Sequence, residues 1–106
     1  MIQINKQLNR PDGGVVAPGS LIKFEPKFNK DALTVTYFLT HYVSQTAIDE
    51  GKKPIPGVED FKYQIQKQCD VDEYLKLNDA GAADLVEEWL KEIIDGLIGA
   101  GNTEIV

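Results

Sequence analysis

Apolar and polar residues alternate along the first two-thirds of the chain, and this period of two constrains the fold more than any other feature. Successive side chains of a β-strand point to opposite faces, so the alternation predicts strands with one buried face. The segments that show it are 2–8, 21–28, 34–46 and 61–69. Pro26 places its strand at a sheet edge or beside a bulge, because proline cannot donate to a ladder of hydrogen bonds.

The two longest alternating segments are predicted to pair as a hairpin. The loop between them, 49–57, contains two prolines and two glycines, which exclude a regular element. We expect 34–46 to be a central strand. One face of the hairpin is strongly apolar and is expected to meet a helix, through Val35, Tyr37, Leu39, Phe61, Tyr63 and Ile65. The opposite face is rich in threonine and carries two aromatic residues, Phe38 and Tyr42, which we expect to contact another protein.

A single amphipathic helix follows the strands, and we predict it from about Ala80 to Ile98. About 19 helical residues span roughly 28 Å, close to the length of a nine-residue strand, so the helix can lie along the sheet. The expected caps are Asn78 or Asp79 before the helix and Gly99 and Gly101 after it. The predicted fold is therefore α+β, with a small antiparallel sheet of three to five strands packed against one long C-terminal helix.

A chain of 106 residues is expected to form one domain with a single modest core, here 1–106. Its two ends, 1–10 and 102–106, are candidate interaction arms. The segment 71–77 is compatible with either helix or strand. As a helix it would be capped by Asp70 or Asp72 and would turn three side chains inward, Tyr74, Leu75 and Leu77.

The apolar arc of the predicted helix is wider than one sheet covers. Large apolar residues recur every four positions while a helix repeats every 3.6, so the stripe drifts to about 220°, against the roughly 100° that one sheet needs. We predict that the late flank of the helix and the chain end form a subunit interface, through Leu90, Ile94, Ile98, Ile105 and Val106. The alternative is that the N-terminal strand or the segment 71–77 covers this flank within one chain.

Charge is unevenly distributed along the chain, whose net charge is −6. Residues 1–67 carry nine basic and seven acidic side chains, whereas residues 68–106 carry two basic and ten acidic ones. An acidic total argues against nucleic acid as a partner, because that affinity comes from Lys and Arg neutralising phosphates. The asymmetry favours docking of one copy's acidic end on another copy's less acidic end, with a solvated acidic helix face as the alternative.

Neither a signal peptide nor a membrane span is expected. The first ten residues lack a basic region followed by an apolar one, and no apolar run approaches 18 residues. The lone cysteine, Cys69, excludes an intramolecular disulfide and fits a reducing compartment. We therefore expect the protein in a virion or in the cytoplasm of a host cell, with no membrane partner.

No motif in the sequence predicts catalysis, a cofactor or a metal. Pairing of 34–46 with 61–69 puts His41 and Cys69 on one face, where a thiolate–imidazole pair is conceivable; a packed core pair is the favoured interpretation. The run 70–73, Asp-Val-Asp-Glu, opens like a calcium loop. That pattern requires Gly and Glu where Leu75 and Gly81 stand, so capping of a short helix is the simpler interpretation.

The order of these parts resembles small α+β structural proteins of tailed phages and prophages, the connector, completion or capsid-accessory class. The resemblance is carried by turns at "PDGGVVAPGS", the strand "LTVTYFLTHYVS", the loop "GKKPIPG", a glutamine-rich strand and the acidic terminal helix. It implies ring or lattice assembly without catalysis or cofactor. We expect a non-enzymatic protein that self-associates and also contacts other virion proteins. The second hypothesis is a monomeric protein- or ligand-binding module that uses the outer sheet face near Phe38 and Tyr42.

Overall fold

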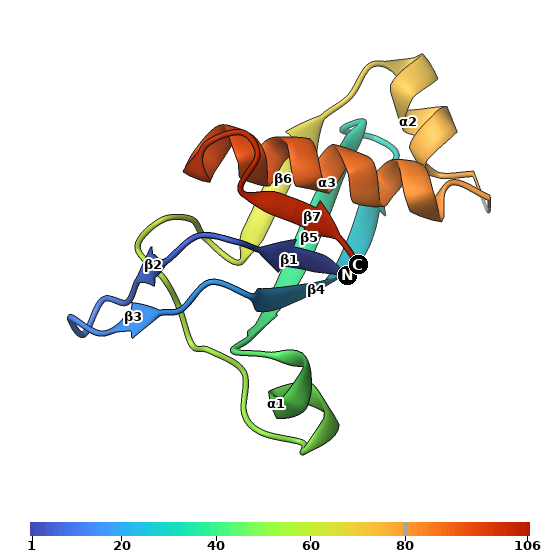
Figure 1. Ribbon diagram of the computed structural model, residues 1–106. Helices are drawn as coiled ribbons and strands as arrows, with labels where there is room; N and C mark the ends of the chain where they lie inside the picture. Colours follow the sequence, from blue (N-terminus) through green and yellow to red (C-terminus); the bar gives the residue numbers. More distant parts are fainter. Residues whose placement is uncertain (80) are drawn as a thin grey trace.

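The computed structural model describes residues 1–79 and 81–106. In this part of the chain a five-stranded antiparallel sheet lies under one long helix, and a short hairpin extends from it (Figure 1). The large sheet has the order β6-β5-β4-β1-β7, formed by β1 Ile2–Ile4, β4 Ser20–Asn29, β5 Thr34–Tyr42, β6 Gln64–Gln68 and β7 Thr103–Ile105. The predicted α+β class, with three to five strands against a long C-terminal helix, is confirmed.

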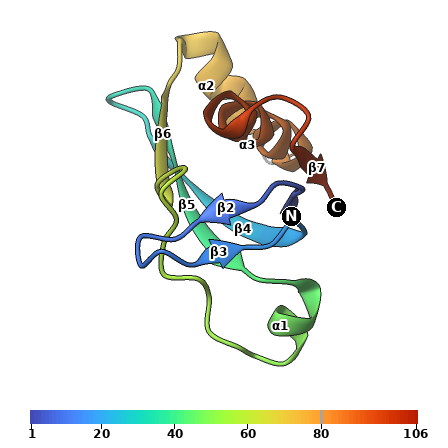
Figure 2. The same cartoon turned by 60° about the vertical axis from the view of Figure 1, so that its left-hand side comes forward.

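The remaining elements lie around this sheet (Figure 2). A second, two-stranded sheet is formed by β2 Leu8–Asn9 and β3 Val15–Val16. The helices of the described residues are α1 Gln45–Asp49, α2 Val71–Leu77 and α3 Ala83–Ile98. None of them is long and apolar enough to cross a membrane.

The predicted hairpin of two long strands is present as β5 and β6, with Tyr37 opposite Ile65. β5 is internal, as expected, because β4 pairs along its other side. The side chains of Val35 and Tyr37 face α3 and are fully buried. The alternation of the sequence therefore placed this face correctly.

β4 is internal in the sheet order, yet half of it lies at an edge. β5 pairs with β4 from Leu21 to Asn29. β1 pairs with β4 over a shorter stretch, at Ser20, Leu21 and Ile22. Pro26 therefore has a strand on one side only, which is why a residue without an N–H group is tolerated there. The predicted edge position of Pro26 is correct locally, although the strand as a whole is not an edge strand.

The start of α3 differs from the prediction. The expected first residue, Ala80, lies outside the described residues, and the described helix begins at Ala83 with Ala82 as an N-cap that has no side-chain hydrogen bond. Asn78 is instead the C-cap of α2, and the Asp79 carboxylate accepts a hydrogen bond from the Gly81 N–H. At the other end Gly99 has a φ of +103°, a value that favours glycine, so the predicted C-terminal boundary is confirmed.

The ambiguous segment 71–77 is a helix. Asp70 is its N-cap and forms a capping box with Glu73, which removes the need to explain these carboxylates by calcium binding. Tyr74 and Leu77 are buried as expected, and the Tyr74 ring packs edge-on against Phe28, with ring centroids 5.8 Å apart. Leu75, predicted to point inward, is 62% exposed, because it follows Tyr74 by one residue and so lies on another face of the helix.

Sequence reasoning missed the helix α1, which occupies a segment assigned to the end of a strand and the start of a loop. Ser44 caps it by accepting a hydrogen bond from the Ala47 N–H. Five residues are too few for a helical period to show in the sequence, so only the serine cap marks it.

Both segments predicted as interaction arms contribute strands to the large sheet. β1 pairs with β4 on one side and with β7 on the other, with Ile2 opposite Ile105. The N-terminal ammonium of Met1 is 3.2 Å from the carbonyl oxygen of Val106, so the two chain ends lie side by side (Figure 1). Neither segment is a free arm.

Candidate functional site

A polar cluster is buried between the sheet and the segment that leads into β6. His41 Nε2 lies 2.8 Å from the Ser20 hydroxyl oxygen, and His41 Nδ1 lies 2.7 Å from the Tyr63 hydroxyl oxygen. Burial lowers the pKa of His41 to about 4 and raises the pKa of Tyr63 to about 12. At neutral pH all three groups are therefore uncharged hydrogen-bonding partners.

This cluster has the residue types of a nucleophile and its base, but not the access. Ser20 and His41 have no exposed surface. A serine nucleophile must reach a substrate atom, and a general base must lie within hydrogen-bond reach of the proton it takes. The geometry therefore fits a structural cross-link of β4, β5 and Tyr63.

The predicted proximity of His41 and Cys69 is wrong. The Cys69 N–H donates to the Leu33 carbonyl, eight residues before His41 along the chain, which places the two roughly 26 Å apart at about 3.3 Å per residue. β6 pairs with the far end of β5, so the shared face did not bring them together. Burial, together with the carboxylates of Glu73 and Asp70, raises the pKa of the Cys69 thiol, which opposes formation of a nucleophilic thiolate.

Among the described residues no group of three or more His, Cys, Asp or Glu side chains is arranged to hold a metal ion. Two of the carboxylates on α3, those of Glu87 and Asp95, have different partners. Glu87 forms an ion pair with the Met1 ammonium at 2.9 Å. Asp95 accepts hydrogen bonds from Lys91 and from the Thr103 hydroxyl. These two carboxylates therefore anchor the two ends of the chain to α3.

The predicted interface on the late flank of α3 is wrong for three of its residues. Leu90 and Ile94 are completely buried, and Ile98 is almost so, in the core of a single chain. The reason is that the sheet under the helix is wider than the hairpin considered in the sequence, because β1 contributes Ile2 and Ile4 to the same core. Cover by the N-terminal strand, the alternative interpretation, is what the structure shows.

The surplus apolar surface of α3 lies on the other flank. Its residues form the row Leu85, Trp89, Ile93 and Leu97, of which the first three pack partly against the core. Lys67 of β6 covers the Trp89 ring, with its Nζ 4.6 Å from the ring centroid. Leu97 is 52% exposed.

The other predicted interface residues remain accessible. Ile105 is 41% exposed at the outer edge of β7, and Val106 beside it is 53% exposed. Phe38 is 42% exposed on the sheet face away from α3, and Tyr42 is half-buried on the same face. The structure thus separates the predicted set into three core residues and four surface residues.

A shallow polar groove crosses the uncovered sheet face. Its volume is about 450 Å³, and Phe38 is the apolar side chain that β5 contributes to its lining. It is lined by Lys27, Phe28, Asn29, Lys30, Thr34, Thr36, Phe38, Gln64 and Gln66. Sequence reasoning found the aromatic residue here, and the alternation of Gln64 and Gln66 was the signal for the polar wall.

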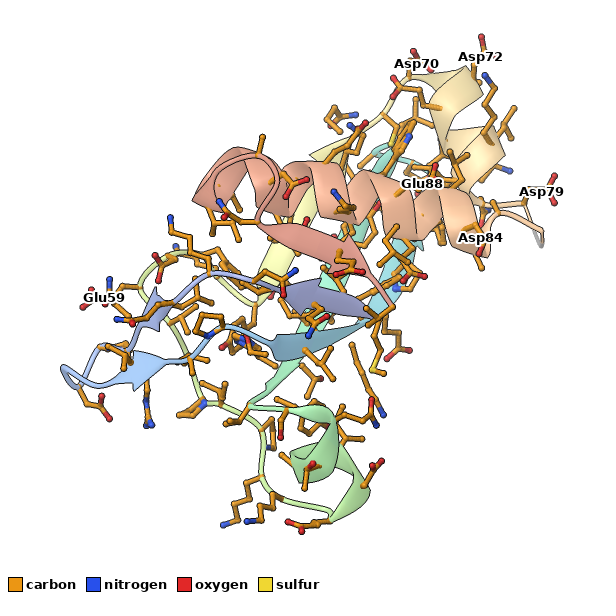
Figure 3. The ribbon with its side chains drawn as sticks, viewed as in Figure 1. Glu59, Asp70, Asp72, Asp79, Asp84 and Glu88 are labelled. Atoms are coloured by element: carbon orange, nitrogen blue, oxygen red, sulfur yellow. The ribbon has the colours of Figure 1, made fainter. Side chains whose placement is uncertain are left out.

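The charge asymmetry of the sequence becomes a separation in space. Asp70, Asp72, Asp79, Asp84 and Glu88 gather at the end of the molecule formed by α2 and the start of α3, and Glu59 lies at the opposite end (Figure 3). On β4 the uncovered sheet face carries two lysines, Lys23 and Lys27, with Glu25 between them. One protein therefore presents an acidic end and a separate surface with basic side chains.

No known protein family matches the chain, and comparisons with curated proteins and with solved structures return no significant match.

Proposed function

We propose that the protein is a non-enzymatic structural protein that self-associates into a homo-oligomer. The observation that carries this proposal is that three of the exposed large apolar residues lie on two open parts of the large sheet. Phe38 lies on the uncovered face, and Ile105 and Val106 lie at the free edge of β7. Exposed apolar groups beside unpaired strand edges are typical association sites.

The two sites differ from each other, which favours a particular kind of assembly. When one patch of a subunit binds a different patch of the next, the contact is heterologous and generates a ring if the rotation closes. Burying one large apolar side chain contributes roughly 1.5–3 kcal/mol, so a few such residues supply a useful part of the association energy. The acidic end and the lysines of β4 add electrostatic complementarity between copies.

A ring-forming, non-catalytic α+β protein fits the role of a phage virion component. We propose a head–tail connector, tail or capsid-accessory protein that acts in the virion or the host cytoplasm and contacts other virion proteins. The support is the order of elements noted in the sequence together with the buried, inaccessible state of Ser20, His41 and Cys69. No cofactor and no nucleic acid is required by this role.

The mass of the protein in solution tests the proposal. Light scattering coupled to size exclusion, at tens of micromolar, is expected to give a multiple of the 11.8 kDa chain mass. The double substitution Phe38→Ser and Ile105→Ser is expected to shift the mass to that of a monomer without unfolding the chain. Leu75→Ser is the matched control, because Leu75 is at least as exposed but lies on α2.

A wild-type protein that stays monomeric under these conditions contradicts self-association. That result favours the second candidate function, a monomeric protein- or ligand-binding module. The observation behind it is the polar groove on the uncovered face, where Phe38 is surrounded by amide and hydroxyl side chains such as Gln66 and Thr36. Such a mixture suits oriented hydrogen bonding around one apolar contact.

A further inference from the structure

The edge of β4 beyond β1 is open, and we call this open edge, Phe24–Phe28, together with the groove beside it the β4 notch. β5 pairs with β4 as far as Asn29, while β1 stops pairing at Ile22. β4 continues past the start of β1 and behind α3 (Figure 1). Among the described residues no strand pairs with this stretch on the side of β1.

The register shows which backbone groups the notch presents. The Leu39 N–H donates to the Tyr63 carbonyl, so the backbone of Leu39 faces away from β4. Phe24 lies opposite Leu39, and opposite residues of an antiparallel pair either face each other or both face away. Phe24 therefore directs its N–H and C=O groups into the notch, and Phe28, four residues later, does the same.

Pro26 lies between them on the same side and offers only its carbonyl oxygen. The notch thus presents two donors and three acceptors to an incoming strand. Ile22, the previous residue of this series, already uses its groups to bind Ile2 of β1. A strand in the notch would continue the line of β1 along β4.

The groove beside this edge is apolar with acidic walls. Its volume is about 270 Å³, and it is lined by Phe24, Pro26, Phe28, Leu77, Asp79, Ala83, Val86 and Glu87. Of the residues that the structure describes, neither a Lys nor an Arg lines it. Asp84 and Glu88 lie at the same end of the molecule as Asp79 (Figure 3).

These features decide between two occupants. A second copy of this chain would bring its own acidic walls against those of the first, which is unfavourable. Two notches paired around Pro26 would also lack the hydrogen bonds that its missing N–H cannot donate. An extended segment of a different protein, with apolar and basic side chains, meets neither obstacle.

We propose that the β4 notch binds an extended segment of a partner protein by strand addition. The segment runs antiparallel to β4 in line with β1, places alternate apolar side chains over Phe24 and Pro26, and sets a Lys or Arg beside Asp79. Main-chain hydrogen bonds hold such a strand, and side-chain pockets select it. This inference rests on the fold and is independent of self-association.

Amide hydrogen exchange tests whether the edge is open. In the free protein the Phe24 and Phe28 amides are expected to exchange at least 100-fold faster than those of Glu25 and Lys27. The latter two lie on the same stretch but face β5. Equal protection of all four amides overturns the proposal. Protection that rises with protein concentration also overturns it, because a second copy is then the occupant.

A tethered strand tests the chemistry of the occupant. The sequence Thr-Lys-Thr-Val-Thr-Val placed directly before Met1 continues β1, with its valines opposite Phe24 and Pro26 and its lysine opposite Phe28. We expect exchange of the Phe24 and Phe28 amides to slow at least 10-fold and Tm to rise. The matched control carries Glu in place of Lys and loses the same Met1 ammonium, and it is expected to protect less. Unchanged exchange, or equal protection by the control, overturns the proposal.

The same peptide, free and with blocked ends, completes the test at about 1 mM, the effective concentration of a short tether. It is expected to shift the Phe24 and Phe28 amide resonances of the unextended protein. In the tethered protein it is expected to shift neither, because the notch is filled. An equal shift in both proteins, or none in the unextended one, contradicts binding at the notch.

Discussion

The two faces of β5 belong to the same nine residues and obey different rules. The face toward α3 is closed, and its side chains are buried, those of Tyr37 and His41 completely. The other face meets water with threonines and Phe38. A polar group on the closed face lowers stability unless it has a partner, as His41 has, whereas one on the open face is satisfied by water. The effect of a polar side chain on stability therefore depends on the face of β5 that carries it.

The largest loss of stability is expected from Leu90→Ala, a truncation over the closed face. Leu90 of α3 is completely buried over the closed face, so its truncation leaves a cavity and is expected to lower the free energy of unfolding by about 2–5 kcal/mol. Phe38→Ala, which removes a larger side chain from the open face of the monomer, is expected to cost less than about 1 kcal/mol. Urea unfolding of both variants measures the difference. Equal losses would contradict the assignment of the two faces.

Acid is expected to act through the closed face. The folded pKa of His41, about 4, lies below its ordinary 6.5, so between these values the unfolded chain binds a proton that the folded chain does not. Stability is therefore complete above pH 6.5 and falls by up to about 3 kcal/mol as the pH decreases toward 4.

The measurement for this prediction is the urea midpoint at a series of pH values between 7 and 4.5. His41→Gln is the control, since an amide does not titrate, and it is expected to flatten the dependence. Asp70 and Asp95 do not interfere. Hydrogen bonds hold the pKa of Asp70 low, and those from Lys91 and Thr103 outweigh the effect of burial on the pKa of Asp95, so their contributions are lost only below a pH of about 4. If the urea midpoint of His41→Gln still falls with pH, a group other than His41 causes the pH dependence.

A smaller effect is expected from deleting one hydroxyl on each face. Ser20→Ala leaves His41 Nε2 buried without its partner, which is expected to cost about 1–3 kcal/mol. Thr36→Ala removes a hydroxyl from the open face, where water replaces it, and is expected to change stability by less than about 0.5 kcal/mol. Thermal unfolding of the pair at pH 7 provides the comparison, and the reverse order would refute it.

The smallest effect, and one of opposite sign, is expected from Tyr37→Phe. The Tyr37 hydroxyl is buried without a hydrogen-bond partner among the described residues, and burial raises its pKa to about 12. Removing an unsatisfied hydroxyl is expected to leave stability unchanged or to raise it by about 1 kcal/mol. If Tyr37→Phe lowers the urea midpoint, the hydroxyl has a hydrogen-bond partner, and this expectation is wrong.

Local sequence patterns correctly predicted the features that neighbouring residues determine, namely strand faces and helix ends. Alternation identified the faces of β5 and β6, Asp70 and Glu73 marked the start of a short helix, and Gly99 marked the end of α3. Long-range pairing escaped the same reasoning. Nothing in residues 103–105 shows that they join β1, and no local pattern shows that Ile2 and Ile4 complete the core that buries Leu90 and Ile94.

The candidate surfaces divide in the same way. Phe38 and Ile105 were found because an apolar residue at a polar position or a chain end is visible in the sequence. The β4 notch was missed, although Pro26 marked an edge, because an open edge is defined by how far another strand extends. The length of β1 relative to β4 is a property of the assembled sheet.

The meeting of the chain ends gives the backbone the path of a nearly closed circle. Because β1 and β7 are neighbours and the Met1 ammonium touches the Val106 carbonyl, a short peptide bridge could join the termini without moving either strand. New ends could then be opened in the exposed loop 50–54, leaving every strand pairing intact. The order of the strands along the chain can thus be changed by circular permutation without changing how they pair in the sheet.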